Sequence, residues 1–409
     1  MNIVVVGGGV FGCMVTYMLS RHGCKVTLID KDLPGKATSA SAGGLWAVGE
    51  SIGLGCGVIF HAKDDTVTTD VGPEPLPREF MDFLLESNRY FPTLTREFEQ
   101  HTGIYVETES DTGLLYVIYN DAEYEYANSL LSWLGDSDVA VEELSRKQVC
   151  AREPLLTTQQ QGGIFFPGDN QINPMLLADA ARRSAVALGA TYQNDTQVTG
   201  LRMQGGNVAG VETNKGDFDC DVLVNAAGTW SGQLAAMAGL QLPIFPVRGQ
   251  ILCTEAMSSQ TLKMNLSTSD CYILQKAHGE ILIGSTTEFS GYDVEVPVEN
   301  LIGLANGASR ALPALRQATV KRSWSGLRPG TPDEFPVLGP VDEVPNYFNA
   351  TGGFRTGIVG APLSADMVAA HILGLEQPFE PSHFLASRFS QDDIRLSAQI
   401  GSQQAPLSD

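Results

Sequence analysis

Three glycines near the start of the chain have the spacing G-x-G-x-x-G and directly follow an apolar run. Residues 4–6 would form a buried strand, and Gly7, Gly9 and Gly12 would lie in the turn that leads into a helix. Gly7 permits a tight turn, Gly9 lets the backbone approach a pyrophosphate, and Gly12 lets the helix pack close to the strand. The dipole of that helix would point its positive end at the phosphates. The pattern predicts a dinucleotide site, with a plain glycine-rich turn as the alternative.

An acidic residue stands where a second strand would end. Residues 25–30 are predicted to form a strand that ends at Asp30, eighteen residues after Gly12. A carboxylate at this place accepts hydrogen bonds from ribose hydroxyls and repels a 2′-phosphate. FAD or NAD is therefore favoured, and NADP is disfavoured.

A second glycine-rich turn comes late in the chain. Gly352 and Gly353 separate a predicted strand at 346–351 from a predicted helix at 358–373. The N-terminus of that helix could face the N1/C2=O edge of a flavin, where its dipole would stabilise the reduced anion. A tightly held flavin is usually enclosed by distant segments, whereas a free nicotinamide needs a mobile cleft. FAD is therefore favoured over NAD, which stays the alternative.

Overall composition narrows the class of protein. A chain of 409 residues is too long for one typical core, so we expect two domains. A net charge of −21 argues against a nucleic-acid partner, because no basic face is available. The sequence shows no charged leader and no apolar run long enough to span a membrane. We therefore expect a cytoplasmic protein and leave peripheral membrane attachment through a partner open.

The residues that commonly bind metals show no metal-binding pattern. Seven cysteines are present and none forms a C-x-x-C pair, so we expect buried free thiols in a reducing compartment. This chain alone would not hold an iron–sulfur centre. The histidines are scattered, and we expect no metal site.

The remaining pattern indicates how the chain is organised. Small residues dominate 36–60, where they would let the backbone press against a flat ligand. Asn173, followed by proline, marks a strong helix start. We expect one helix over 79–101, helical structure over 121–150 and a strand-rich second layer over 241–325. The last twenty residues are polar and are expected to fray.

Several segments together resemble the D-amino-acid oxidase superfamily of FAD enzymes, which includes glycine and sarcosine oxidases. The matching stretches are the first glycine turn with Asp30, and residues 41–45, 225–230, 326–333 and 352–358. The resemblance implies an α/β fold with a Rossmann-like FAD-binding domain and a second α+β substrate domain built on an antiparallel sheet. The superfamily commonly has Gly-His at the late turn. This chain has Gly352 and Gly353 there, which puts one packing contact near the flavin in doubt.

The same resemblance implies a discontinuous division of the chain. The FAD-binding domain would comprise residues 1–80, 140–238 and 323–390. The substrate domain would comprise residues 81–139 and 239–322, followed by a flexible tail at 391–409.

Residues 37–60, 268–272 and 384–389 look more specifically like the flavin subunits of bacterial hydrogen cyanide synthases. Those enzymes oxidise glycine to cyanide and carbon dioxide, with hydride transfer from the α-carbon to flavin N5. The likeness implies a small amino acid as substrate, an iron–sulfur partner subunit and a second partner of flavin type, and it leaves membrane association through the complex open. Alternatives are a sister dehydrogenase for an opine, D-hydroxyproline or proline, a stand-alone glycine or sarcosine oxidase, and a flavin-binding subunit without catalysis.

The resemblance also implies residues for the substrate site. Arg328 would grip the substrate carboxylate, because a planar guanidinium makes two charge-assisted hydrogen bonds, and an interdomain salt bridge is the alternative. Arg355 would share the carboxylate or stabilise the flavin. Tyr272 would close the substrate pocket unless it is a plain core aromatic, and Trp46 could cover the pocket unless it too is core. Cys56 could approach a partner's iron–sulfur cluster.

Predicted FAD contacts lie along the same segments. The backbone of Val198 would meet the adenine, residues 41–45 the pyrophosphate and ring, and residues 352–356 the pyrimidine edge. The full set is Gly7, Gly9, Val10, Phe11, Gly12, Asp30, Lys31, Ser41, Ala42, Gly43, Gly44, Leu45, Val198, Ala227, Gly228, Trp230, Arg328, Gly352, Gly353, Phe354, Arg355 and Thr356.

Overall fold

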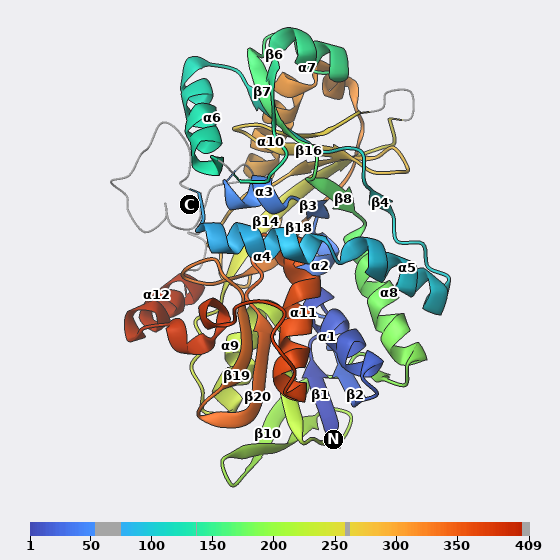
Figure 1. Ribbon diagram of the computed structural model, residues 1–409, viewed down its shortest axis with the longest axis vertical. Helices are drawn as coiled ribbons and strands as arrows, with labels where there is room; N and C mark the ends of the chain where they lie inside the picture. Colours follow the sequence, from blue (N-terminus) through green and yellow to red (C-terminus); the bar gives the residue numbers. More distant parts are fainter. Residues whose placement is uncertain (54–74, 136, 258–261, 403–409) are drawn as a thin grey trace.

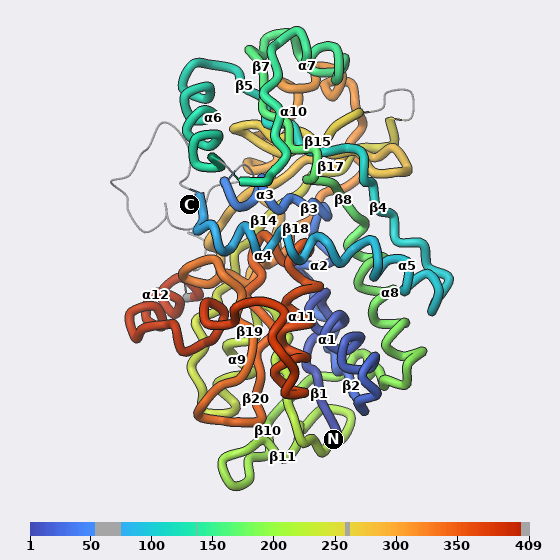
Figure 2. The backbone as a smooth tube through the Cα atoms, in the orientation of Figure 1, coloured from blue at the N-terminus to red at the C-terminus, as the bar shows by residue number. Residues whose placement is uncertain are grey.

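The computed structural model describes residues 1–53, 75–135, 137–257 and 262–402. Two regions built on separate sheets are stacked along the long axis of the molecule (Figure 1). Stretches from the beginning, middle and end of the sequence lie together in the lower region (Figure 2). Such an arrangement is what a discontinuous division of the chain requires, while the predicted boundaries stay a prediction.

The lower sheet contains six strands in the order β19-β20-β13-β1-β2-β9. Neighbours run parallel except for β19, which pairs antiparallel with β20. The predicted strands at 4–6, 25–30 and 346–351 are confirmed. The bounds are β1 (Asn2–Val6), β2 (Lys25–Ile29), β9 (Thr191–Gln193), β13 (Val222–Asn225), β19 (Val337–Val341) and β20 (Val344–Thr351).

Alternate residues of β1 enter two different cores, because successive side chains of a strand point to opposite faces. Ile3 and Val5 pack with helices α1 (Val10–Arg21), α8 (Pro174–Ala187) and α11 (Gly357–Leu373). Val4 and Val6 pack on the other face with strands β10 (Val198–Gln204) and β11 (Asn207–Thr213) and helix α9 (Ser231–Met237). Burial on both faces explains why the strand reads as a continuous apolar run.

The upper sheet contains eight strands in the order β18-β14-β17-β16-β15-β5-β7-β6. Its pairs are antiparallel except for β15 with β5, which confirms the predicted antiparallel second layer. Helices α6 (Asp121–Leu134) and α10 (Val298–Ala311) contribute to the cores on its two faces. The bounds are β5 (Leu114–Ile118), β6 (Glu142–Ser145), β7 (Gly162–Phe166), β14 (Phe245–Thr254), β15 (Asn265–Ser267), β16 (Tyr272–Gln275), β17 (Ile281–Gly284) and β18 (Val320–Gly330).

Smaller elements lie around and between the two sheets. A short sheet has the order β3-β8-β4, and β12 (Phe218–Asp219) pairs with β11. The remaining bounds are β3 (Gly44–Leu45), β4 (Thr108–Glu109), β8 (Asn170–Ile172), α2 (Ala37–Ala40), α3 (Ala47–Ser51), α4 (Arg78–Asn88), α5 (Phe91–Thr102), α7 (Arg146–Arg152), α12 (Gln391–Ser402) and the 3-10 helices η2 (Gly228–Trp230), η3 (Pro313–Gln317), η4 (Ser382–Phe384) and η5 (Ala386–Arg388).

Three local expectations were wrong. The helix expected over 79–101 is two helices, α4 and α5, because Pro92 in the first turn of α5 cannot donate the backbone hydrogen bond that would continue α4. The helical structure expected over 121–150 is interrupted by β6, whose Leu144 is buried against the sheet. The tail expected to fray from residue 391 begins as helix α12, which buries Ser397 and Ile400.

The described cysteines form no disulfide. Burial raises the pKa of the Cys13 thiol to about 12, which keeps it protonated and unreactive. Cys56 lies outside the described residues. Among the helices that the structure describes, none combines the length and apolarity needed to cross a membrane.

The carboxylate of Asp169, in the turn between β7 and β8, holds helix α3 in place. It accepts hydrogen bonds from the backbone N–H groups of Val48 (3.1 Å) and Gly49 (2.6 Å). Asp169 is 1% exposed, and burial raises its pKa from 3.8 to about 7 in spite of these hydrogen bonds. Between about pH 4 and pH 7 the folded chain therefore keeps a proton that the unfolded chain has lost, so this group lowers stability as the pH rises.

We therefore expect Asp169→Asn to flatten the dependence of stability on pH. The difference in slope should approach 1.4 kcal/mol per pH unit, or up to about 4 kcal/mol over the window. Urea unfolding at several pH values between 4 and 8 measures it, and Asp217→Asn at an exposed position is the control. Parallel curves for wild type and Asp169→Asn would contradict the assignment.

Candidate functional site

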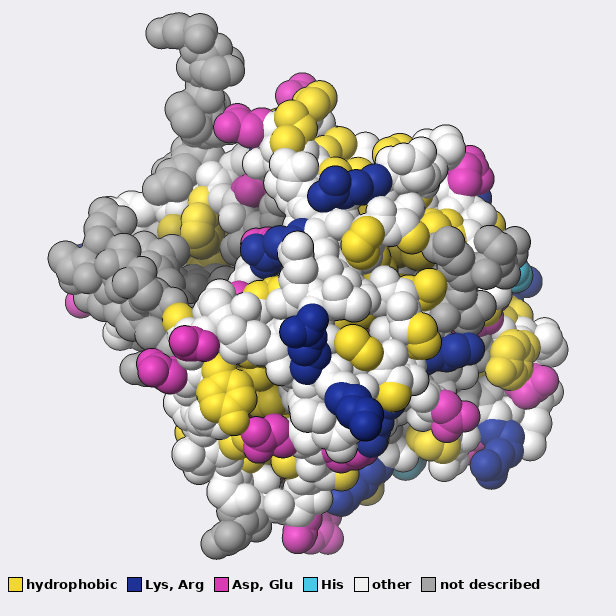
Figure 3. All heavy atoms as spheres, turned by 90° about the horizontal axis from the view of Figure 1, so that it is seen from above, with side chains coloured by type: hydrophobic (Ala, Val, Ile, Leu, Met, Phe, Trp, Pro, Cys, Tyr) yellow, Lys and Arg dark blue, Asp and Glu magenta, His cyan; other side chains and the backbone are white. Residues whose placement is uncertain are grey.

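A cavity of about 390 Å³ lies between the two sheets. Its wall is built from the β1–α1 turn, residues 36–44, helix η2, the β20–α11 turn and parts of β14, β16 and β18. These segments come from both ends and the middle of the chain (Figure 2). On the outside, the face drawn in Figure 3 carries Lys and Arg side chains scattered among apolar and acidic ones.

The first glycine turn has the geometry that its spacing predicts. Gly7 has a φ of +113°, and a Cβ there would lie 2.2 Å from the carbonyl oxygen of Ala226. A Cβ on Gly12 would lie 1.8 Å from the carbonyl oxygen of Gly7, so only glycine lets α1 pack this closely. Within the described part of the chain, a Cβ on Gly9 would meet only Thr38 Oγ1, at 3.4 Å, which leaves its backbone open to the cavity.

Asp30 lies in the cavity wall, but it already has a protein partner. Its Oδ2 forms an ion pair with Lys36 Nζ, and Lys36 also pairs with Asp32 at 2.8 Å. A Cβ on Gly8 would lie 2.6 Å from the same Asp30 oxygen, so the central position of the glycine run is required as well. Sequence reasoning missed Lys36 and Gly8, although the unbroken run of three glycines was a signal for the second.

The late glycine turn, where the superfamily commonly has a histidine, leaves little room for a side chain at Gly353. A Cβ on Gly353 would lie 2.9 Å from Cζ of Phe11 in α1. The Phe11 ring therefore occupies the space that a larger side chain would need. The two glycine turns, from opposite ends of the chain, meet at this contact.

The cavity wall has the features that a bound FAD requires. Among the residues that the structure describes, none other than chain neighbours would lie within 4 Å of a Cβ on Gly228 or Gly357, so the backbone is open there. The N-caps of α1 and α11, Gly9 and Thr356, make no side-chain capping hydrogen bond, although the Val10 N–H of α1 donates to Thr38 Oγ1 at 3.0 Å. The remaining backbone N–H groups at helix N-termini beside a cavity can donate to phosphate and to the pyrimidine edge of a flavin.

Most of the predicted FAD contacts line this one cavity. Val198 is in the wall, although its predicted contact with adenine stays a prediction. Gly12, Leu45 and Thr356 are not in the wall, because Gly12 and Leu45 pack in the core and Thr356 Oγ1 donates to the Gly353 carbonyl. The predicted residues that do line it are Gly7, Gly9, Val10, Phe11, Asp30, Lys31, Ser41, Ala42, Gly43, Gly44, Val198, Ala227, Gly228, Trp230, Arg328, Gly352, Gly353, Phe354 and Arg355.

Arg328 lies in the wall on β18, opposite Val247 of β14. Its guanidinium donates to the Thr286 carbonyl (3.1 Å) and to Ser285 Oγ (2.6 Å). It also lies across Gly249, where a Cβ would be 2.3 Å from two of its nitrogens. Within the described part of the chain, no carboxylate pairs with Arg328, so the alternative of a salt bridge has no partner there.

Arg355 is in a different situation, because it has a carboxylate partner. Its Nη2 lies 2.5 Å from Glu50 Oε2, and the two side chains are 7% and 14% exposed. Both residues line the cavity. Sequence reasoning missed Glu50, although it is the one charged residue among the small residues of 37–60.

Tyr272 and Trp46 form an aromatic pair in the same part of the wall. Their rings are 5.3 Å apart and nearly perpendicular. The indole lies against Gly44, where a Cβ would be 2.7 Å from it, and the phenol ring lies against Gly284. Tyr272 and Trp46 are 8% and 3% exposed, so each belongs both to the core of the upper sheet and to the cavity wall. The two alternatives that the sequence left open, a core aromatic and an aromatic that lines the pocket, therefore do not exclude each other.

Comparison with known proteins agrees with this geometry. Residues 2–371 match the family described as FAD dependent oxidoreductase. The chain is 42% identical to the hydrogen cyanide synthase subunit HcnC of Pseudomonas aeruginosa, over 97% of this chain and 98% of that protein. It is also 42% identical to HcnC of Pseudomonas protegens, over 96% and 97% of the two chains.

A solved structure is similar along the same length. Glycine oxidase from Geobacillus kaustophilus superposes with a TM-score of 0.83 and 27% identity, covering 95% of this chain and 98% of that one. The expected fold of an FAD-binding region with an antiparallel second region is confirmed. The chain belongs to the family of FAD dependent oxidoreductases, and its cofactor is FAD.

Proposed function

We propose that this chain is the glycine-oxidising flavin subunit of a hydrogen cyanide synthase. The observation that carries the proposal is the guanidinium of Arg328, which lines the FAD cavity without a carboxylate partner among the described residues. A substrate that bears a carboxylate would supply that partner. The 42% identity to two HcnC subunits supports glycine and cyanide as the substrate and product.

The reaction removes four electrons from glycine in two steps. First the α-carbon loses a hydride and the nitrogen a proton, which gives the imino acid. Then the bond between the α-carbon and the carboxylate breaks and carbon dioxide leaves, the electron pair of that bond is removed, and the nitrogen loses its remaining proton, which gives HCN. FAD, when bound, would supply the acceptor for each pair of electrons, and an iron–sulfur partner subunit would carry them away.

The protein contributes position and charge. Arg328 would hold the carboxylate in two hydrogen bonds, so that the α-carbon has one fixed orientation. Trp46 and Tyr272 would cover the substrate and leave little space for a side chain on its α-carbon. The ion pair of Glu50 with Arg355 would lie beside the substrate, and because the two charges cancel it would add no net charge to the site.

Stand-alone glycine oxidase is the second candidate function, because a glycine oxidase structure superposes over nearly the whole chain. The two candidates differ in product and in electron acceptor. The purified chain with FAD, kept free of oxygen, should lose its flavin absorbance when glycine is added and should recover it with an artificial acceptor. Cyanide measured in stoichiometric amount supports the first candidate. Full-rate hydrogen peroxide formation in air without cyanide supports the second, and bleaching with proline or an opine but not glycine contradicts both.

Replacing Arg328 should damage substrate binding and leave the cofactor in place. Arg328→Ala removes two charge-assisted hydrogen bonds, so KM for glycine should rise on the order of 100-fold. Steady-state kinetics measures KM, and the flavin-to-protein absorbance ratio measures retained FAD. Arg388→Ala, which removes a guanidinium that binds Asp333 away from the cavity wall, is the matched control. An unchanged KM in Arg328→Ala would show that the carboxylate binds elsewhere.

Shortening Trp46 should widen the range of substrates. Trp46→Leu opens space above the α-carbon, so the ratio of kcat/KM for alanine to that for glycine should rise about tenfold. The ratio is measured with both enantiomers, and Trp133→Leu, in a partly buried tryptophan outside the cavity wall, is the control. If the ratio moves equally in both variants, Trp46 does not limit substrate size.

A further inference from the structure

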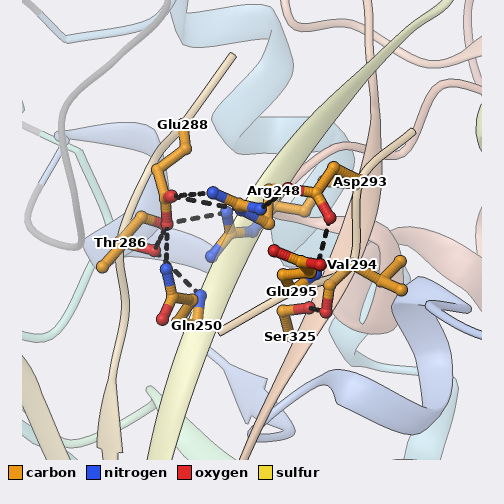
Figure 4. Close-up of polar contacts among 9 residues, drawn as sticks. Arg248, Gln250, Thr286, Glu288, Asp293, Val294, Glu295 and Ser325 are labelled. Carbon is orange, nitrogen blue, oxygen red and sulfur yellow. Dashed lines mark hydrogen bonds and ion pairs between the residues drawn. The ribbon is translucent and has the colours of Figure 1, made fainter. Parts of the chain in front are cut away.

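A buried arginine, Arg248, lies one strand position from Gly249 in the cavity wall. Arg248 on β14 is 3% exposed and pairs with two carboxylates, Glu288 Oε2 at 2.7 Å and Asp293 Oδ2 at 2.5 Å (Figure 4). The backbones of Arg248 and Glu288 also exchange two hydrogen bonds, of 2.9 and 3.0 Å. One guanidinium thus fixes both Glu288 and Asp293 against β14.

The other oxygen of Glu288 extends this network toward Thr286. Glu288 Oε1 accepts from Gln250 Nε2 at 2.7 Å and from the hydroxyl of Thr286. That hydroxyl in turn accepts from the backbone N–H of Gln250 at 2.9 Å. Residues 285–288 are therefore held on β14 by polar contacts that reach back to Arg248.

The same short segment holds Arg328 from its other side. The Thr286 carbonyl and Ser285 Oγ accept the hydrogen bonds from the Arg328 guanidinium. Thr286 therefore links the carboxylate of Glu288 to the guanidinium of Arg328. In the pairing of β14 with β18, Arg328 is opposite Val247, next to Arg248, so neighbouring positions place the two arginines on opposite faces.

Charge is distributed unequally between the two arginines. Arg248 is surrounded by two carboxylates, whereas Arg328 pairs with none among the described residues. The Glu288 side chain is 18% exposed, and a carboxylate in that position that loses its guanidinium is driven toward water or another cation. Because Thr286 joins Glu288 to Arg328, a movement of Glu288 would displace the carbonyl that holds Arg328.

We propose that Arg248 is a positioning residue for the substrate site. By holding Glu288 and Asp293 it fixes the segment that orients Arg328. Arg328 then stays available to a substrate carboxylate. The inference rests on the proposed function, in which Arg328 binds that carboxylate.

A set of three variants tests this role. In Arg248→Met the released Glu288 should move and displace Thr286, which orients Arg328, so KM for glycine should rise at least tenfold while kcat stays within about threefold. In Glu288→Gln, which removes the charge and keeps the shape, KM should stay within about threefold of wild type. In the double variant Arg248→Met/Glu288→Gln, most of the tenfold rise should be lost, a non-additive result that a purely structural role does not produce.

Acetate binding provides a readout that needs no turnover. Acetate has the carboxylate of glycine and nothing to oxidise, and its Kd is measured from the change in flavin absorbance of the FAD-loaded protein. The Kd should follow the same order as KM across the three variants. Glu153→Gln, at a fully buried carboxylate outside the cavity wall, is the control and should leave Kd unchanged.

Each failure has a separate meaning. If Arg248→Met and the double variant show the same KM and acetate Kd, the role assigned to Arg248 is wrong. If Arg248→Met does not fold, Arg248→Lys keeps one charge but cannot bridge both carboxylates, and an unchanged KM in that variant also overturns the inference. If Arg328→Ala leaves acetate binding unchanged, the proposed function itself fails.

Discussion

The pairing of β14 with β18 is the constraint on which the site depends. The two strands pair from Phe245 with Gly330 to Thr254 with Val320, so they extend from the upper sheet into the cavity wall. The last residues of β18 also bond on their other side, where Leu327 donates to the Gly35 carbonyl and the Pro329 carbonyl accepts from Phe354. One strand end thus joins the substrate region, the segment after β2 and the late glycine turn.

Glycines at three contact points make this junction possible. A Cβ on Gly326 would lie 2.3 Å from the Cβ of Ala40, and one on Gly249 would lie in the Arg328 guanidinium. A Cβ on Gly353 would meet Phe11. Close approach at these three places brings the two regions near enough for one cavity to be lined by both, so that a flat cofactor and a small substrate can share it.

The buried and half-buried charges around the cavity follow one principle, which is that a charge withdrawn from water needs a partner. Asp30 has Lys36, Glu50 has Arg355, and Glu288 and Asp293 have Arg248. Arg328 stands apart from these pairs because its described partners are a carbonyl and a hydroxyl, which do not neutralise it. In the proposed function, this guanidinium without a carboxylate partner among the described residues would bind an anionic group of the substrate.

The sequence by itself determined the local features of the dinucleotide site. Gly7 and Gly12 could be assigned because each role depends on a turn within one β–α unit, and β1 and β2 could be predicted from short apolar runs. The tertiary structure alone decided which charges face each other: Glu50 and Arg355 are 305 residues apart, and the partners of Arg328 lie 42 and 43 residues away. Spacing along the chain carries no information about such contacts, because they depend on the register of β14 with β18 and on the close packing at glycines from both ends of the chain.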